Sequence, residues 1–252
     1  MTTDPVLIEV CVDSVASALA AERGGAQRIE LCSDLLEGGV TPSLGLLGIV
    51  RSRLSIGVHV IIRPRPGDFC YSDPELESMQ RDIEFAKREG AHGVVFGVLT
   101  SDGHVDTERT RRLVEIARPL SVTFHRAFDV SANLFQALED ICATGADRIL
   151  TSGGEQDCLQ GAETIAKLVQ SARGRTVIMA GGGIGIQNAP TIIAHTGVRE
   201  IHVGLATPVN GQAHHPKSRL SLVKTQGLEY HRTEVREENV RKLRQAVSLT
   251  TD

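Results

Sequence analysis

The sequence lacks the features that mark several large functional classes. Its longest apolar stretches, such as residues 58–62, are far shorter than the ~20 residues that a membrane-spanning helix needs, so we expect no membrane span. It has no block of like charge, and a formal net charge of -4 leaves no basic face for nucleic acid. It also contains no Cys-x-x-Cys pair, His-Glu-x-x-His helix, nucleophile elbow or Walker loop. We therefore expect neither a membrane partner nor a nucleic-acid partner.

Cysteine is scarce and odd in number. The five cysteines are Cys11, Cys32, Cys70, Cys142 and Cys158, and no apolar signal segment accompanies them. This pattern predicts reduced thiols and a cytoplasmic location, because structural disulfides belong to oxidising compartments. Cys142 and Cys158 stand at expected helix positions, where a thiol serves as a small apolar filler, whereas Cys70 lies in an expected loop.

A glycine-led motif occurs four times, at residues 25–29, 90–94, 145–149 and 197–201. In each copy a glycine suited to ending a helix precedes a short run that suits a strand. Four further strands are expected at residues 7–12, 58–63, 122–126 and 176–180, and helical patterns fill residues 15–23, 75–89, 107–117, 134–143 and 164–172. Eight strand–helix units in 252 residues predict a (β/α)8 TIM barrel. We expect a single domain over residues 1–252, with the barrel core at 6–205 and a C-terminal loop and helix at 206–252.

Two of the expected strands carry the same short motif, 21 residues apart in the sequence. Glu9 precedes Cys11 by two residues, and Glu30 precedes Cys32 in the same way. Because side chains alternate along a strand, the carboxylate and the thiol of each copy share a face, and neighbouring parallel strands would bring all four together. Two adjacent thiols suit a soft ion such as Cu(I) or Zn(II). Buried cysteine also occurs as simple filler, but two buried carboxylates need partners, so the pattern favours a site.

Other polar residues gather where expected strands end, at the barrel face where such enzymes build their active sites. Since a barrel interior should hold Val, Ile and Leu, ionisable groups at this rim predict function. His125 suits a general base, a metal ligand or a structural histidine, and we expect only one of His125 and Arg126 to reach the centre. His214 and His215 fall in a polar loop and are left out of the site.

An anion site is a second hypothesis for the same rim. The glycine triplet at 181–183 would allow a ligand to approach the backbone closely, although a tight turn also selects glycine. The residues expected to bind an anion are Arg63, Arg65, Asp68, Ser152, Gly181, Gly182 and Gly183.

The ordered motifs resemble those of the CutC copper homeostasis family over roughly residues 6–205. The matching segments are Glu9-Val10-Cys11, Arg28-Ile29-Glu30-Leu31-Cys32, Ile62-Arg63-Pro64-Arg65, Thr123-Phe124-His125-Arg126-Ala127-Phe128-Asp129, Leu150-Thr151-Ser152-Gly153 and the glycine triplet. Two positions depart from the family's usual pattern, Pro66 and the Val203-Gly204 pair after His202. Both changes fall in the expected anion site and leave Cys11 and Cys32 unchanged, so they weaken the anion hypothesis more than the copper hypothesis.

The resemblance implies a cytoplasmic TIM barrel that handles copper and forms a dimer or tetramer. It also implies that Cys11 and Cys32 are the ligands of a Cu(I) ion, with Glu9 and Glu30 as secondary contacts at best. The alternative function is a barrel enzyme that acts on a small anionic or phosphorylated substrate, in which Glu9, Glu30 or His125 transfers protons.

Overall fold

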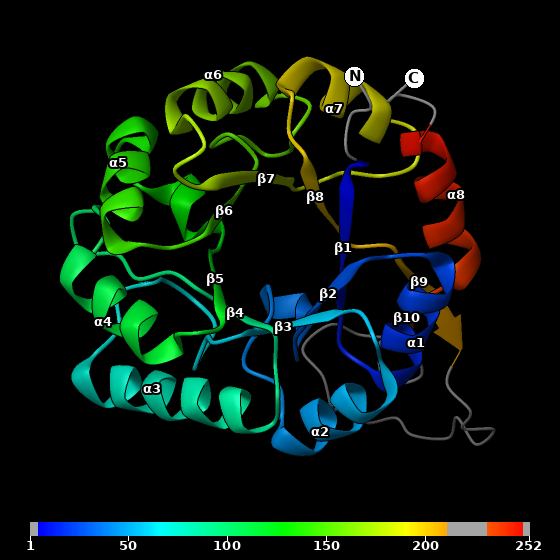
Figure 1. Ribbon diagram of the computed structural model, residues 1–252, viewed down its shortest axis with the longest axis horizontal. Coiled ribbons are helices and arrows are strands. Elements are labelled where there is room, and N and C mark those ends of the chain that lie inside the picture. The colour runs from blue at the N-terminus through cyan, green and yellow to red at the C-terminus, as the bar shows by residue number, and fades with distance from the viewer. Residues whose placement is uncertain (1–4, 211–230, 249–252) are drawn as a thin grey trace, which may run out of the picture.

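Eight parallel strands close into a barrel in the computed structural model, which describes residues 5–210 and 231–248. The strands are β1 (Leu7–Val12), β2 (Arg28–Leu31), β3 (Gly57–Ile61), β4 (Gly93–Phe96), β5 (Ser121–Phe124), β6 (Arg148–Thr151), β7 (Val177–Gly181) and β8 (Glu200–Val203). Each pairs with the next, and β8 pairs with β1. Figure 1 shows the ring of strands with the helices outside it. The predicted TIM barrel is therefore confirmed.

The helices cover the outside of the barrel. They are α1 (Val15–Gly24), α2 (Leu44–Arg53), α3 (Asp73–Arg88), α4 (Thr107–Ala117), α5 (Leu134–Thr144), α6 (Ala162–Ala172), α7 (Ala189–Thr196) and α8 (Glu237–Ser248). The glycines of the repeated motif, Gly25, Gly90, Gly145 and Gly197, all have positive φ and follow helices, as their sequence context predicts. Among the described residues, none of the helices is both long and apolar enough to cross a bilayer.

Two expected strands end earlier than their sequences predict. The strand expected at 58–63 ends at Ile61, because the backbone of Arg63 exchanges hydrogen bonds with Thr41 instead of continuing the sheet. The strand expected at 122–126 ends at Phe124, and Arg126 begins the short helix η2 (Arg126–Val130). In both places the chain thus leaves the sheet earlier than expected, at the C-terminal end of the barrel.

The segment expected as a loop and helix at 206–252 contains a pair of antiparallel strands, β9 (Ala206–Asn210) and β10 (His231–Val235), followed by α8. Helix α8 packs on α1 and completes the outer ring of helices beside α7 (Figure 1). Gly24 permits this contact, since a Cβ there would lie 2.5 Å from the Cβ of Val240. His214 and His215 lie outside the described residues.

Apolar and charged side chains divide between the two faces of the strands. Ile8, Val10, Ile29 and Leu31 are fully buried in the apolar core, the layer that the outer helices cover. The alternate positions, which meet one another across the barrel, hold polar groups instead. The expectation that the barrel interior holds Val, Ile and Leu is wrong for this layer, because Glu9, Arg28, His59 and Arg148 are buried there.

Candidate metal and polar site

The two cysteine thiols meet at the C-terminal end of the barrel. Cys11 ends the inward face of β1, Cys32 follows directly after β2, and their Sγ atoms lie 3.6 Å apart. The Oε2 atom of Glu30 lies 3.4 Å from the Sγ of Cys11 and 3.3 Å from that of Cys32. Gly39 closes over this pair, since a Cβ there would lie 3.4 Å from the Sγ of Cys32.

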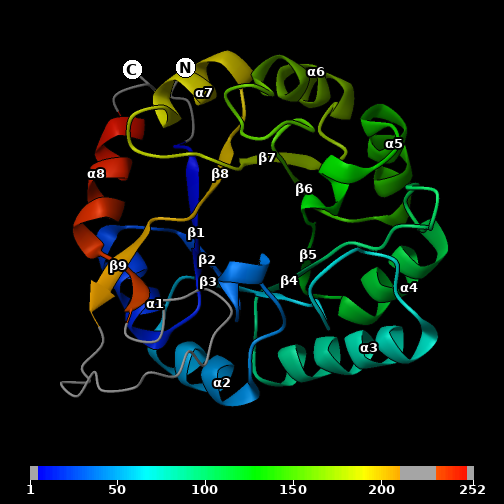
Figure 2. The same cartoon turned by 180° about the vertical axis from the view of Figure 1, so that it is seen from behind.

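A short loop covers the mouth on the side of the thiols. The helix η1 (Leu35–Glu37) lies within the ring of strands when the barrel is seen along its axis from either side (Figures 1 and 2). The loop is tied down by Arg63, whose Nη1 donates to the carbonyl oxygens of Glu37 and Gly39 at 2.8 and 2.9 Å. Two positive-φ glycines, Gly38 and Gly39, let the chain turn back sharply over the thiols.

His202 also belongs to this site, and the sequence analysis missed it. Its Nδ1 lies 2.7 Å from Oε1 of Glu9, and its Nε2 lies 3.9 Å from Oε2 of Glu30. Barrel closure aligns Glu9 with His202 across the β1–β8 pairing. The sequence signal was a histidine on a strand that is otherwise rich in apolar residues. That strand alone could not predict the contact with Glu9, which lies 193 residues away in the sequence.

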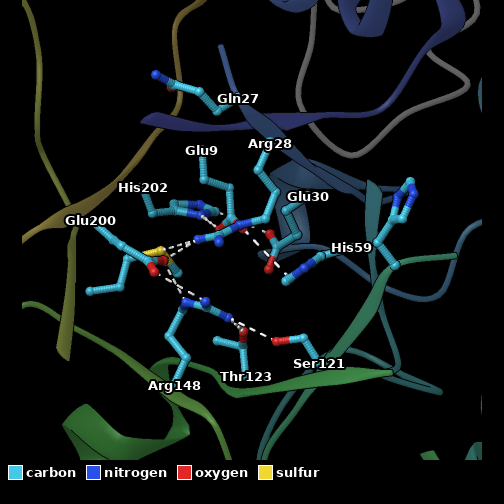
Figure 3. A network of polar contacts seen from close by, with 12 residues as sticks. Glu9, Gln27, Arg28, Glu30, His59, Ser121, Thr123, Arg148, Glu200 and His202 are labelled. Atoms are coloured by element: carbon cyan, nitrogen blue, oxygen red, sulfur yellow. Dashed lines mark hydrogen bonds and ion pairs between the residues drawn. The ribbon is translucent and has the colours of Figure 1, made fainter. Parts of the chain in front are cut away.

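A layer of ion pairs lies deeper in the barrel. Arg28 pairs with Glu9 through Nε, and its Nη2 lies 2.5 Å from Glu200. Arg148 also pairs with Glu200, at 2.5 Å (Figure 3). These contacts compensate two buried guanidinium groups inside a barrel, where an unpaired charge would be costly. The strand alternation that places Arg28 two residues before Glu30 could have revealed this layer.

The proximity of these groups shifts their pKa values in opposite directions. Hydrogen bonding from Cys32 and the nearby His202 lower the pKa of the Cys11 thiol to about 5, although burial opposes the shift. Burial and the charge of Cys11 raise the pKa of Glu30 to about 8. The hydrogen bond with Cys11 and burial raise the pKa of Cys32 well above its usual range. One sulfur is therefore readily a thiolate, which is the form that binds metal.

His202 and Glu9, below the thiols, stabilise each other's charged forms. Burial disfavours an imidazolium at His202, but Glu30, Cys11 and Glu9 together raise its pKa well above the usual value. Burial likewise opposes ionisation of Glu9, but Arg28 and His202 hold its pKa well below the usual range. Glu9 is thus a fixed carboxylate anchor for Arg28 and His202.

His125 is buried where β5 ends and η2 begins. Its Nδ1 accepts a hydrogen bond from the backbone N–H of Ala127 at 3.2 Å, and its ring packs 4.9 Å from that of Phe69. Burial, with the charge of Arg63, lowers the pKa of His125 to about 3. A neutral ring whose Nδ1 accepts a hydrogen bond carries its proton on Nε2. The Nε2 atom of His125 is therefore suited to donate a hydrogen bond, and the ring is poorly suited to act as a general base. Arg126 extends to a 43% exposed position and pairs with Asp129, so His125 is the one of the two that is buried.

The residues expected to bind an anion are not gathered into one cup. Arg63 donates hydrogen bonds from Nη1 to the backbone carbonyls of Glu37 and Gly39, and from Nη2 to that of Gly67. Arg65 pairs with Glu75 and with Asp68, in the loop that precedes α3. These two arginines therefore support loops in the structure.

Ser152 and the glycine triplet form a separate hydrogen-bonded corner. Ser152 accepts from Arg126 at 2.7 Å and bonds to Asp129, while the carbonyl of Gly182 accepts from the N–H of Cys158. Gly182 and Gly183 have positive φ, and a Cβ on Gly182 would lie 3.3 Å from the guanidinium of Arg126. The triplet here lets the chain turn close to side chains of the neighbouring strand.

The remaining cysteines lie apart from the thiol pair. Cys158 is fully buried, Cys142 lies in α5, and the half-buried Cys70 donates to the carbonyl of Thr100 at 3.2 Å. Within the described residues, the donor atoms that lie close enough to share one ion form two groups, Cys11–Glu30–Cys32 and Glu9–Glu30–His202. The donor chemistry therefore fits a soft ion at the sulfurs, with carboxylate and imidazole close by.

The fold and the site together define a (β/α)8 barrel with a thiol, carboxylate and imidazole cluster at its C-terminal end. The family model of the CutC family matches residues 6–207. The chain belongs to the CutC family.

Named relatives support the assignment. The "Copper homeostasis protein cutC homolog" of Homo sapiens is 54% identical over 196 residues, which cover 78% of this chain and 72% of the relative. A family protein CutC of Xanthomonas campestris is 48% identical over 228 residues, covering 90% of this chain and 94% of the relative.

Solved structures agree with the fold. The structure from Streptococcus agalactiae that is described as a CutC copper homeostasis protein is 35% identical, has a TM-score of 0.75, and covers 78% of this chain and 97% of that chain. A phosphoribosylanthranilate isomerase from Thermotoga maritima has a TM-score of 0.58 at 12% identity, with 96% of this chain and 98% of that chain covered, and shares the fold alone.

Proposed function

We propose that this protein binds Cu(I) in the cytoplasm through Cys11 and Cys32 and takes part in copper homeostasis. The observation that carries the proposal is the 3.6 Å separation of the two Sγ atoms at the C-terminal end of the barrel. Thiolate sulfur is the ligand that Cu(I) prefers, and the lowered pKa of Cys11 favours its thiolate near neutral pH. The names of the relatives point the same way. A dimer or tetramer remains part of this proposal.

An anaerobic Cu(I) titration against a competing chelator tests the metal site. We expect one tightly bound Cu(I) per chain in the intact protein and loss of that binding in Cys11→Ser/Cys32→Ser. The matched control is Cys70→Ser/Cys142→Ser, which changes two thiols away from the pair and should bind Cu(I) like the intact protein. Tight binding that persists without Cys11 and Cys32 would rule out this site.

One observation favours the alternative function, an enzyme or binder for a small anion. Of the buried arginines, Arg28 and Arg148 are paired with carboxylates, whereas Arg63 has no carboxylate within ion-pair distance in the part of the chain that the structure describes. The Nε atom of Arg63 and the Nε2 atom of His125 also lack hydrogen-bond partners there. An oxyanion bound beside them would compensate the buried charge and accept from both donors.

Thermal unfolding in the presence of inorganic phosphate or succinate tests this alternative. At matched ionic strength, either anion should raise the Tm of the metal-free protein above its value in sodium chloride, and His125→Gln should reduce the effect. Equal Tm values in all three salts would remove the alternative. The readout needs no copper, so it is independent of the Cu(I) titration.

A further inference from the structure

The two thiols of the pair differ in their access to solvent. Cys11 is partly exposed, whereas Cys32 is only 1% exposed. Gly39 lies over Cys32, because it is itself buried and a Cβ on it would lie 3.4 Å from the Sγ of Cys32. A metal ion that arrives from solvent with ligands of its own therefore meets one sulfur, and a part of the protein that covers Cys32 has to move before the ion reaches the other.

Gly39 belongs to the mouth loop (residues 34–39), which is closed on itself. The N–H of Gly39 donates to the carbonyl of Asp34 at 3.0 Å, and at the base of the loop Ser33 and Val40 exchange two backbone hydrogen bonds. Its short helix η1 lies within the ring of strands in Figure 2. Because these bonds are internal, the loop can swing about residues 33 and 40 as one unit and keep them.

Few contacts hold the mouth loop to the barrel. Beyond the base, the hydrogen bonds from other described residues to this loop are the two that Nη1 of Arg63 donates, to the carbonyls of Glu37 and Gly39. Leu36 is 81% exposed, so its apolar side chain adds little burial. Asp34 has a φ of 52°, in the left-handed region that disfavours residues other than glycine. A segment with so few buried contacts opens at a lower free energy than the whole fold.

We propose that the mouth loop is a lid over Cys32, held closed by Arg63, and that it opens to admit or release the metal ion. The inference rests on the proposed function only in taking Cys11 and Cys32 as the metal-binding pair. Glu30 also contacts Cys32, but it belongs to β2, which could move only by breaking the hydrogen bonds of the sheet. Opening of the mouth loop breaks only the two bonds from Arg63 beyond its base.

Alkylation of Cys32 by N-ethylmaleimide measures the opening without copper. The rate is followed by peptide mass spectrometry in metal-free Cys11→Ser protein, so that the more exposed thiol does not interfere. Arg63→Lys keeps the charge but loses the planar guanidinium that reaches two carbonyls. Gly39→Ala places a side chain at a φ of 87°, against Cys32. We expect each change to speed alkylation of Cys32 at least about fivefold, since backbone strain or a lost hydrogen bond has an effect of this order.

Two controls separate opening of the lid from unfolding of the whole protein. Gly174→Ala introduces the same strain at a φ of 74° with no atom within 4 Å of the new Cβ, so the alkylation rate of Cys32 should stay the same. In the Cys11→Ser protein, low concentrations of urea should speed the reaction of Cys32 only weakly, because a short loop exposes little surface. The fully buried Cys158 should respond steeply, as global unfolding does. An equally steep response of both thiols, or equal acceleration of Cys32 by Gly174→Ala and Gly39→Ala, would overturn the lid.

Release of Cu(I) to excess chelator, followed by stopped flow, tests the lid with both cysteines in place. Arg63→Lys and Gly39→Ala should release the ion about fivefold faster, whereas the Kd should change less than about threefold. The lid is closed before and after binding, so its opening equilibrium enters both rates and cancels in their ratio. Faster alkylation in both variants, with no tight Cu(I) binding by the intact protein, would uphold the lid and reject the copper function. Tight Cu(I) binding with unchanged alkylation and release rates would do the reverse.

Discussion

Cys11 lies opposite Glu30, and not opposite Cys32, in the parallel pairing of β1 with β2. The two motifs are 21 residues apart in the sequence, but the register joins residues 19 apart. This stagger of two residues belongs to the shear by which strands tilt and close into a barrel. It places the carboxylate of Glu30 against both sulfurs, while Glu9 is left opposite Arg28 and His202. A sequence repeat that looks symmetric thus yields two glutamates with different roles.

That difference predicts a large loss of stability for Glu9→Gln. The Glu9 side chain is fully buried and bonds to both Arg28 and His202, so the neutral amide would leave two buried cationic groups with less compensation. We expect the free energy of unfolding to fall by about 3 kcal/mol or more. Urea denaturation of the metal-free protein measures the change.

The matched control for that substitution is Glu163→Gln. Glu163 also pairs with a cation, Lys167 at 2.8 Å, but its side chain is 78% exposed, so the urea midpoint should hardly move. Similar midpoints for Glu9→Gln and Glu163→Gln would show that the buried ion pairs do not stabilise the barrel.

The sequence predicted the fold well because local signals repeat along the chain. The strand at Leu7–Val12 and the helix at Thr107–Ala117 have the bounds that their patterns predict. The helix expected at residues 75–89 begins two residues earlier, at Asp73, because Ser72 forms a capping box with Glu75. Such differences of one or two residues leave the topology unchanged.

The site was less accessible to sequence reasoning, because its contacts depend on closure of the barrel. Alternation along two strands sufficed to place Cys11 near Cys32, since both motifs carry the same pattern. The approach of His202 to Glu9 requires β8 to pair with β1, and no local pattern contains that information. The loop contacts of Arg63 depend on two glycine conformations at Gly38 and Gly39, which sequence alone permits but does not select.

A glycine on β4 makes room for a buried histidine on β3, and this gives a second prediction. Gly93 pairs with His59 in the sheet register, and a Cβ at position 93 would lie 2.5 Å from Nε2 of His59. We expect Gly93→Ala to lower the free energy of unfolding by about 1–3 kcal/mol, through overpacking inside the barrel. In a His59→Ala background the same change should cost less, with a coupling of about 1–2 kcal/mol.

Urea denaturation of the four proteins in this cycle gives the coupling directly. Gly45→Ala in the first turn of α2 is the control, because no atom lies within 4 Å of a Cβ at that position. There the substitution should be neutral or stabilising by up to about 1 kcal/mol. An equal cost of Gly93→Ala with and without the His59 ring would mean that the ring moves aside freely.

The buried neutral ring of His125 makes stability depend on pH, which gives the last prediction. Burial and the charge of Arg63 lower the pKa of His125 from 6.5 to about 3. Between these two values the unfolded chain binds a proton at His125 that the folded chain does not, so folding stability falls as the pH is lowered through this window. In His125→Gln this contribution is absent. Between pH 6 and 4, the unfolding free energy of the intact protein should therefore fall relative to that of His125→Gln by about 1.4 kcal/mol for each pH unit of acidification.

Urea denaturation at several pH values, with His104→Gln as the exposed control, measures this slope. Comparing each variant with the intact protein removes the contributions of all other titrating groups, including His59, whose pKa burial also lowers to about 3. The control curve should run parallel to that of the intact protein, and the His125→Gln curve should converge on it or cross it as the pH falls. Parallel curves for all three proteins would mean that His125 takes up its proton in the folded state, and the barrel mouth would then have to supply a charge or a water path that its packing against Phe69 does not provide.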